Sequence, residues 1–173
     1  MLSAHADTTE KNLIVNGDFE QMENGVAAGW TVLKGASGSI ASFPAEPGKG
    51  NIGRVDNTQN TQSAYLSQWV KLEPHQNYRL SLQAAMSSGK LTFAAGSTGL
   101  NKRMFGELTE ELPMAPLFWD ESWLASIPFE PGQWREASME FNSGDVTKVL
   151  ITLGGFFSKG SYLFDDVKLV KIP

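Results

Sequence analysis

The side chains of this sequence that could bind a ligand or take part in a reaction are mainly carboxylates and aromatic rings. Its 173 residues include 19 Asp and Glu, five Trp, two His and no Cys. The lack of Cys excludes disulfides, thiolate zinc sites and cysteine nucleophiles. Because His5 lies in an N-terminal tail and His75 in a turn-like stretch, a Ser/His/Asp triad or a multi-histidine metal site would have poorly placed parts.

Exposed aromatic rings beside polar side chains are an arrangement that binds sugars. A pyranose stacks its C–H face on a ring while its hydroxyls hydrogen-bond to polar neighbours. Tyr65 and Trp69 fit this arrangement, because they alternate with the apolar residues of segment 65–72 and lie about 13 Å apart along an extended strand. Further candidate sugar contacts are Arg79, Gln83 and Trp30.

A long segment from Ser97 to Glu130 shows no sustained alternation and holds two cationic and six acidic residues. A connection of this length is usually functional or disordered, and its Pro, Phe and Trp residues are too apolar for disorder. We therefore predict a long ordered insertion around residues 97–130. Its Trp119 and Trp123 either pin the insertion onto the rest of the domain or line the wall of a ligand site.

Carboxylates in the same segment permit an enzymatic alternative. A glycosidase needs two carboxyl groups about 5 to 9 Å apart on either side of the scissile bond. The candidates are Glu110, Glu111, Asp120 and Glu121. Solvated loop charges are far commoner than catalytic pairs, so we predict that the protein is not an enzyme.

The apolar pattern predicts an all-β fold. Short apolar runs alternate with Gly, Asn, Ser and Pro clusters along the chain. Segments 65–72 and 78–85 both alternate and flank a turn at Pro74, so we interpret them as a hairpin that brings the candidate aromatic and polar side chains onto one surface. Further strands are predicted at 91–93, 134–141, 148–153 and 162–170, with Trp134 and Phe141 in the core. Many short antiparallel strands favour a two-sheet antiparallel β-sandwich of the jelly-roll type.

Length and charge limit the organisation and the partners of the chain. A single domain is expected, which we place at residues 12–173 after a flexible tail of residues 1–11. The net charge of −5 argues against nucleic acid and anionic membranes, because both are bound by clustered cations. No apolar stretch reaches the ~20 residues of a membrane span. The small-x-small triplet at residues 4–6 has the pattern of a signal-peptidase site and favours export.

The last predicted strand carries an anomaly. Its alternation places Asp165 on the same face as Leu163, Val167 and Leu169. A bare carboxylate among apolar side chains costs several kcal/mol to bury. Asp165 therefore needs a partner.

Several motifs occur in a recognisable order. They are Asn12–Glu20, Trp30, Gln68 with Val70 and Leu72 before a turn and Tyr78, Gly132-Gln133-Trp134, and Phe164–Leu169. Together they resemble the carbohydrate-binding modules of families 4, 9, 16 and 22, over residues 12–170.

The resemblance implies a galactose-binding-like β-sandwich with a structural calcium ion near the chain termini. Carried over to this sequence, the calcium ligands fall on Glu20 and Asp165, with Asp18 and the turn at residues 48–51 as sources of carbonyl oxygens. A hard cation surrounded by oxygens would satisfy the Asp165 carboxylate. The alternative is that Asp165 accepts hydrogen bonds from backbone amides and that no metal is bound.

The resemblance also implies a function. We expect a non-catalytic module, secreted or at the cell surface, that binds a polysaccharide or oligosaccharide and targets a linked or partner enzyme to it. The module is expected to be a monomer or part of a larger enzyme. The alternatives are a cell-surface adhesion or assembly domain that binds protein, and a small glycan-active hydrolase.

Overall fold

The described part of the chain consists of strands and loops. The computed structural model describes residues 10–33, 40–61, 64–88, 91–96, 132–155 and 158–173. These ranges contain no helix, and so none with the length and apolarity to cross a membrane. The strands are β1 (Met22–Glu23), β2 (Val26–Ala27), β3 (Thr31–Leu33), β4 (Ile40–Ser42), β5 (Ala45–Glu46), β6 (Gly50–Asn51), β7 (Gly53–Asn57), β8 (Ala64–Lys71), β9 (Asn77–Met86), β10 (Leu91–Gly96), β11 (Arg135–Asn142), β12 (Lys148–Gly155) and β13 (Gly160–Ile172).

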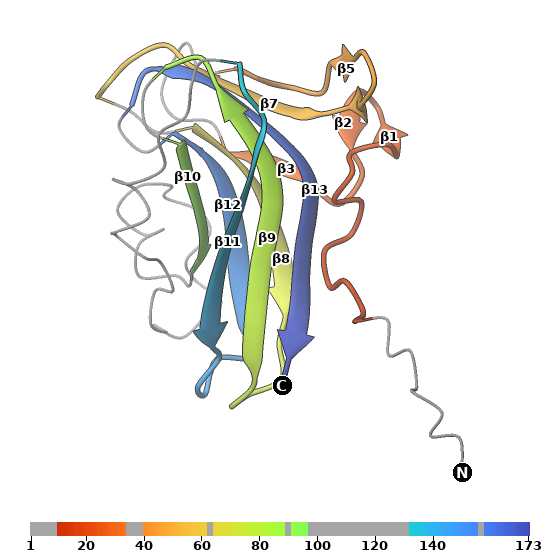
Figure 1. The fold of residues 1–173 in the computed structure, drawn as a ribbon, viewed down its shortest axis with the longest axis vertical. Helices are drawn as coiled ribbons and strands as arrows, with labels where there is room; N and C mark the ends of the chain where they lie inside the picture. The colour runs from red at the N-terminus through yellow and green to blue at the C-terminus, as the bar shows by residue number, and fades with distance from the viewer. Residues whose placement is uncertain (1–9, 34–39, 62–63, 89–90, 97–131, 156–157) are drawn as a thin grey trace.

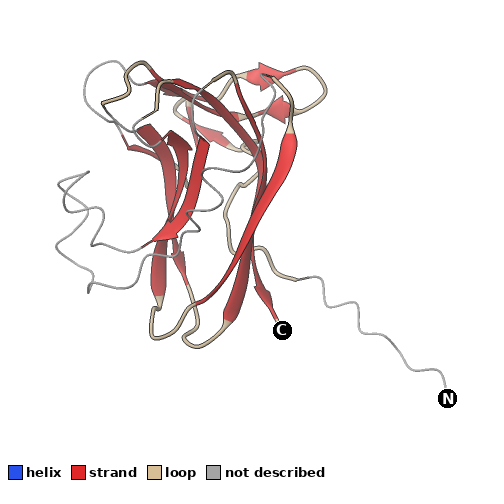
Figure 2. Cartoon of the chain, turned by 60° about the vertical axis from the view of Figure 1, so that its left-hand side comes forward, coloured by secondary structure: helices blue, strands red, loops and turns tan. Residues whose placement is uncertain are grey.

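Two antiparallel sheets face each other and form the body of the molecule (Figure 2). One sheet has four strands in the order β10-β12-β8-β3, and the other has five in the order β11-β9-β13-β7-β4. Two short ribbons, β1-β2 and β5-β6, lie at one end of the sandwich (Figure 1). The predicted all-β, two-sheet antiparallel sandwich is confirmed. The predicted insertion at 97–130 and most of the predicted tail lie outside the described residues.

Strands β8 and β9 are consecutive in sequence but belong to different sheets. β8 pairs with β12 and β3, whereas β9 pairs with β11 and β13. The predicted hairpin between segments 65–72 and 78–85 is therefore wrong. Alternation records only that each strand turns one face toward an apolar layer. Two consecutive strands on opposite walls of one core produce the same pattern as a hairpin.

The alternating apolar residues of both sheets meet in one core. Leu66 and Val70 of β8 lie in it opposite Leu80 and Leu82 of β9, and each is at most 4% exposed. The predicted inner faces of β11 and β12 also pack there, through Ala137, Met139, Phe141, Val149, Ile151 and Leu153. Burial of this apolar surface, at roughly 25 cal/mol per Å², is the main source of stability.

One polar side chain in the core fastens the N-terminal segment. Gln68 lies on the inner face of β8 and is 6% exposed. Its carboxamide accepts a hydrogen bond from the Val15 N–H at 2.8 Å and donates one to the Val15 carbonyl at 2.9 Å. The Leu13 N–H donates to the Leu169 carbonyl at 2.8 Å, so segment 12–17 also runs beside β13 (Figure 1). This segment therefore bridges the two sheets.

A bulge in β13 changes the predicted position of Asp165. The register with β9 shifts just after Asp165, and Asp166 has a positive φ of 51°. Phe164 faces the core before the bulge and Val167 faces it afterwards, whereas Asp165 pairs with Gln83 on the outer face. The prediction that Asp165 shares the core face is therefore wrong, because one inserted residue shifts the alternation.

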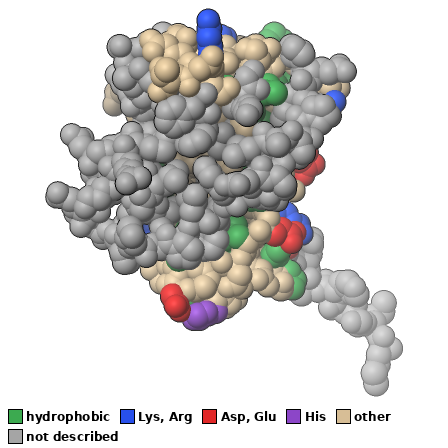
Figure 3. Space-filling model, turned by 90° about the vertical axis from the view of Figure 1, so that its left-hand side faces the viewer, with side chains coloured by type: hydrophobic (Ala, Val, Ile, Leu, Met, Phe, Trp, Pro, Cys, Tyr) green, Lys and Arg blue, Asp and Glu red, His purple; other side chains and the backbone are tan. Residues whose placement is uncertain are grey.

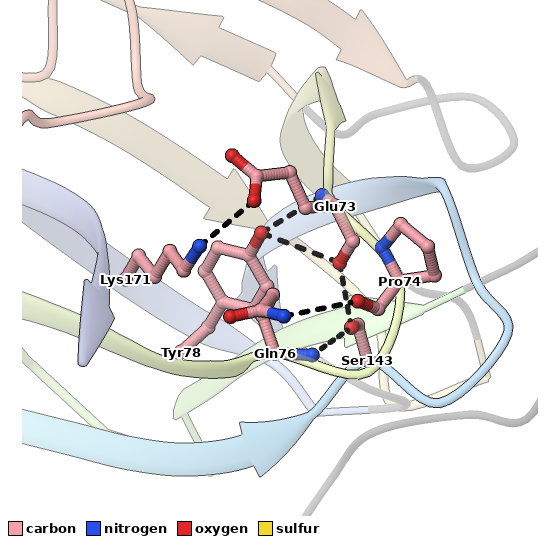
Figure 4. Close-up of polar contacts among 6 residues, drawn as sticks. All are labelled: Glu73, Pro74, Gln76, Tyr78, Ser143 and Lys171. Carbon is pink, nitrogen blue, oxygen red and sulfur yellow. Dashed lines mark hydrogen bonds and ion pairs between the residues drawn. The ribbon is translucent and has the colours of Figure 1, made fainter. Parts of the chain in front are cut away.

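Hydrogen bonds fix the connection from β8 to β9 at one end of the sandwich (Figure 4). The Tyr78 hydroxyl accepts from the Glu73 N–H at 2.8 Å and donates to the Glu73 carbonyl at 3.4 Å. The Ser143 hydroxyl, from the β11–β12 loop, donates to the same carbonyl at 2.8 Å and accepts from the Gln76 N–H at 3.0 Å. Lys171 of β13 pairs with the Glu73 carboxylate at 2.8 Å. Three elements thus hold the chain where it crosses from one sheet to the other.

Candidate functional site

The outer face of the four-stranded sheet carries the predicted aromatic pair. Tyr65 and Trp69 lie on the face of β8 that points away from the core, as alternation predicts. They differ in exposure, because Tyr65 is 4% exposed whereas Trp69 is half-buried. Of these two rings, Trp69 is the one with surface available to a ligand.

Two lysines lie beside Trp69. Across β8 and β12, Trp69 pairs with Leu150, and Lys71 pairs with Lys148. The Lys148 Nζ lies 4.9 Å from the centroid of the Trp69 ring, which is a cation–π contact. Within the described part of the chain, the Trp69 indole N–H has no hydrogen-bond acceptor and the Lys148 ammonium has no carboxylate partner. Neither group is therefore satisfied by the described residues alone.

Arg79 and Gln83 lie on the other side of the molecule. Both project from the outer face of β9, and Arg79 pairs with Glu140 of the neighbouring β11 at 2.8 Å. Because β8 and β9 belong to opposite sheets, these residues do not share a surface with Tyr65 and Trp69. The predicted binding surface is therefore divided between two faces, and this part of the prediction is wrong.

Trp30 is a core residue. It is 5% exposed, its ring centroid lies 5.1 Å from that of Phe19, and its Nε1 donates to the Asn16 carbonyl at 2.9 Å. The prediction that Trp30 contacts a sugar is therefore wrong. The remaining candidates, Trp119 and Trp123, lie outside the described residues.

A second half-buried tryptophan, Trp134, precedes β11 and is not part of the core, contrary to the prediction. It stands three positions before the inward-facing Ala137, so alternation places it on the outer face. Its Nε1 donates to Glu46 Oε1 at 3.2 Å, and Lys49 Nζ lies 4.1 Å from its ring centroid. Lys49 also pairs with Asp165 at 3.3 Å. The polar groups of this cluster are thus paired with one another, unlike those at Trp69.

Glu20 is held against the turn between β5 and β6. Its carboxylate accepts hydrogen bonds from the Asn51 N–H at 2.9 Å and from the Asn51 side-chain amide at 3.4 Å. Gly50 has a positive φ of 81°, and a Cβ there would lie 1.9 Å from Glu20 Oε1. The lack of a side chain at this position therefore lets the carboxylate approach the turn.

Asp165 reaches the same turn from the five-stranded sheet. It is 5% exposed, and its Oδ1 accepts the Asp166 N–H at 2.8 Å while its Oδ2 faces Lys49. Burial raises the pKa of Asp165 above its ordinary 3.8, and this effect exceeds the lowering by the Asp166 N–H and by Lys49. The ionised carboxylate is therefore short of stabilising positive charge.

Glu20, Glu46 and Asp165 all border the β5–β6 turn. Within the described ranges, however, no group of three or more His, Cys, Asp or Glu side chains is close enough to hold a metal ion by itself. A metal here would take part of its ligands from backbone carbonyls. Asp18 is exposed and lines a separate polar hollow of about 280 Å³ next to Asp166.

Lys148 and Glu46 belong to these sites, although no sequence pattern marks them. The role of Lys148 depends on its register with β8, which lies far away in the sequence. Glu46 accepts a hydrogen bond from the indole N–H of Trp134. Counting the alternation of β11 back from Ala137 would have placed Trp134 on the outer face. That count was the one available signal.

Comparison with known proteins identifies the fold. No protein-family model matches the sequence, and no curated protein matches it. The CBM22-1 xylan-binding domain from Paenibacillus barcinonensis matches in structure with a TM-score of 0.60 and 16% identity, over 94% of this chain and 96% of that domain. A CBM4 structure matches with a TM-score of 0.59 and 16% identity, over 92% of this chain and 99% of the other. The fold is therefore shared with these carbohydrate-binding modules.

The same fold also occurs within a larger protein. The enzymatically active domain of tailspike protein 4 from bacteriophage CBA120 matches with a TM-score of 0.62 and 13% identity, over 93% of this chain and 21% of that one. This chain thus spans about a fifth of the tailspike chain. At these identities the likeness establishes the fold alone, and a binding site has to be argued from the geometry of this chain.

Proposed function

We propose that this protein is a non-catalytic carbohydrate-binding module that binds a polysaccharide or oligosaccharide on the outer face of its four-stranded sheet. The observation that carries the proposal is Trp69, a half-buried ring on the outer face of a sheet in a carbohydrate-binding-module fold. Its indole N–H lacks an acceptor within the described part of the chain. A sugar would stack on the face of the ring, while the in-plane indole N–H would donate to a hydroxyl of a neighbouring sugar unit beside the ring.

The outer face of the five-stranded sheet is the weaker candidate. Arg54 pairs with Asp56 at 2.9 Å, and Arg79 pairs with Glu140. Groups that are already paired must give up these contacts before they bind a ligand. At the edge of the sandwich, between the two outer faces, the charged side chains that are described lie in small separate groups (Figure 3).

The proposed role is attachment. A module bound to a polysaccharide raises the local concentration of a linked or partner catalytic domain at that surface. Xylan is the first polysaccharide to test, because one of the matching structures is described as a xylan-binding domain. The proposal requires binding without any change in the glycan.

Affinity electrophoresis against a panel of polysaccharides, with product analysis of each bound glycan, tests the proposal. Trp69→Ala should weaken binding by about 2 kcal/mol, a ~30-fold change, because it removes the stacking surface. Trp69→Phe keeps a stacking ring but loses the indole N–H, so it should retain part of the affinity. Arg79→Ala, on the outer face of the opposite sheet, should bind as the wild type does.

The results separate the alternatives. Loss of affinity in Arg79→Ala but not in Trp69→Ala would move the site to the five-stranded sheet. Cleaved glycan in the product analysis would show a hydrolase. A screen in which no glycan binds would contradict the proposal.

We also propose that calcium binds at the β5–β6 turn, with Glu20 and Asp165 as ligands. The donors at this turn suit a hard cation, because the available groups are carboxylate and carbonyl oxygens. Support comes from Asp165, whose ionised form is destabilised by burial and is paired only with Lys49 at 3.3 Å among the described side chains. A calcium ion would neutralise this carboxylate. By binding Glu20 and Asp165 together, it would also join the turn to β13.

Thermal melting in calcium and in EDTA tests this assignment. Calcium at a hundredfold excess over its Kd should add about 2.7 kcal/mol to the free energy of unfolding. Lys49→Gln should strengthen calcium binding, since the variant removes the competing ammonium. If instead Lys49→Gln lowers the melting temperature and neither protein responds to calcium or EDTA, Lys49 is the counter-charge of Asp165 and no calcium is bound.

A further inference from the structure

Two lysines face each other beside the proposed sugar platform. Lys71 and Lys148 are direct cross-strand partners on the outer face of the four-stranded sheet, and Trp69 is two positions along β8 from Lys71. Side chains in such a pair have Cβ atoms about 5 Å apart, and like charges in this arrangement destabilise a sheet. A pair of this kind has an energetic cost in the unliganded protein.

No acidic group in the described part of the chain offsets this cost. Neither Lys71 nor Lys148 lies within 4 Å of a described carboxylate, whereas Lys49 and Lys171 are each paired with one. Arg54 and Arg79 are also paired. Among the described residues of this face, the unpaired positive charge is therefore concentrated at Lys71 and Lys148, next to the Trp69 ring.

Lys148 lies over the ring on which a sugar would stack. Its ammonium lies 4.9 Å from the centroid of the Trp69 ring and covers part of the surface on which a sugar would stack. A neutral sugar must displace the ammonium and offers no charge in exchange. A sugar with a negatively charged substituent gives the displaced ammonium a new partner and relieves its repulsion with Lys71.

We infer that the ligand of this face is an acidic glycan, whose carboxylate or sulfate group is bound by Lys148 and Lys71 while its ring stacks on Trp69. This inference rests on the proposed function and specifies its class of ligand. It does not require a basic protein, since the net charge of −5 is an average over the whole chain and the two lysines act locally.

The experiment compares matched glycans that differ only in charge. Binding is measured by affinity electrophoresis and calorimetry with glucuronoxylan and its carboxyl-reduced form, polygalacturonate and its carboxyl-reduced form, and dextran sulfate and dextran. The proteins are the wild type, Lys148→Gln, Lys71→Gln and Lys168→Gln. Lys168 is an exposed lysine on the five-stranded sheet, so its replacement changes the net charge equally and serves as the control.

The wild type should bind at least one acidic glycan about fivefold or more tightly than its neutral counterpart, with a preference that falls as salt rises. Lys148→Gln should remove the preference and tighten binding of the neutral form, because the ring is uncovered. Lys71→Gln should reduce the preference, and Lys168→Gln should leave it unchanged. The carboxylate and sulfate arms show which group is bound.

Failure of this inference is distinct from failure of the proposed function. Binding that is lost in Trp69→Ala but is equal for acidic and neutral glycans, in both the wild type and Lys148→Gln, overturns the inference and leaves the proposed function standing. A preference that Lys168→Gln reduces as much as Lys148→Gln is a general effect of charge and also overturns it. If no glycan in any arm is bound, both fail.

Discussion

Asp165 shows at the scale of one residue how burial and charge oppose each other. Its pKa is raised by burial, so the folded protein holds this proton more tightly than the unfolded chain does. Folding then takes up protons, and the contribution of Asp165 to the free energy of unfolding decreases as the pH rises from 3.8 toward the folded-state pKa.

The corresponding prediction is a pH dependence that changes sign with calcium. In EDTA, the wild type should lose stability relative to Asp165→Asn as the pH rises through this window, as measured by urea unfolding. In saturating calcium the trend should reverse, because calcium binds the ionised carboxylate. Parallel curves for the two proteins in EDTA would contradict a raised pKa at this position.

The same scale shows what sequence can predict about a site. Alternation correctly placed Tyr65 and Trp69 on the outer face of their strand. It could not show that Tyr65 is covered, because burial on an outer face depends on what packs over it. It also could not place Lys148 against Trp69, since that contact depends on pairing between distant segments.

At the scale of elements, the β5–β6 turn depends on two glycines with different surroundings. Gly48 and Gly50 have nearly equal positive φ values, 80° and 81°, but a Cβ at Gly48 meets nothing within 4 Å. A Cβ at Gly50 meets the end of the Glu20 side chain, which is flexible and would swing away from its hydrogen bond with Asn51.

Replacing each of these two glycines by Ala gives a pair of variants that can be compared directly. Gly48→Ala and Gly50→Ala should each lose about 1 kcal/mol from backbone strain. Gly50→Ala should lose about 1 kcal/mol more, through the hydrogen bond of Glu20, and should be the variant in which the response to calcium is weakened. Chemical denaturation with and without calcium measures both effects. Equal losses and equal calcium responses would show that Glu20 has no role at this turn.

Elements were easier to predict from sequence than their neighbours in the sheets. The strands at β8, β9, β11, β12 and β13 follow from alternation, because each has one face in the core. The crossover between β8 and β9 was missed because both sheets share that core. The bulge after Asp165 could not be predicted, because the positive φ of Asp166 that marks it is a property of the folded backbone.

At the scale of the whole molecule, fold and function separate. The two-layer fold is shared with carbohydrate-binding modules at 16% identity, and such a likeness does not transfer contacts residue by residue. The all-β class followed from composition and alternation, and the particular sandwich fold followed from a resemblance in ordered motifs. The composition of the proposed ligand face followed from neither, because it required knowing which sheet each strand joins.

The N-terminal segment beside β13 has a mechanical consequence. Segment 12–17 runs antiparallel to β13, with Leu13 bonded to Leu169 and Gly17 to Val167, so both ends of the described chain leave on the same side (Figure 1). A load pulling the two ends apart would open these bonds one after another, as a zipper opens, instead of shearing them together. If the module anchors something under tension, this seam is the first part to yield, and optical-tweezer traces should show a low-force step before the sandwich itself unfolds.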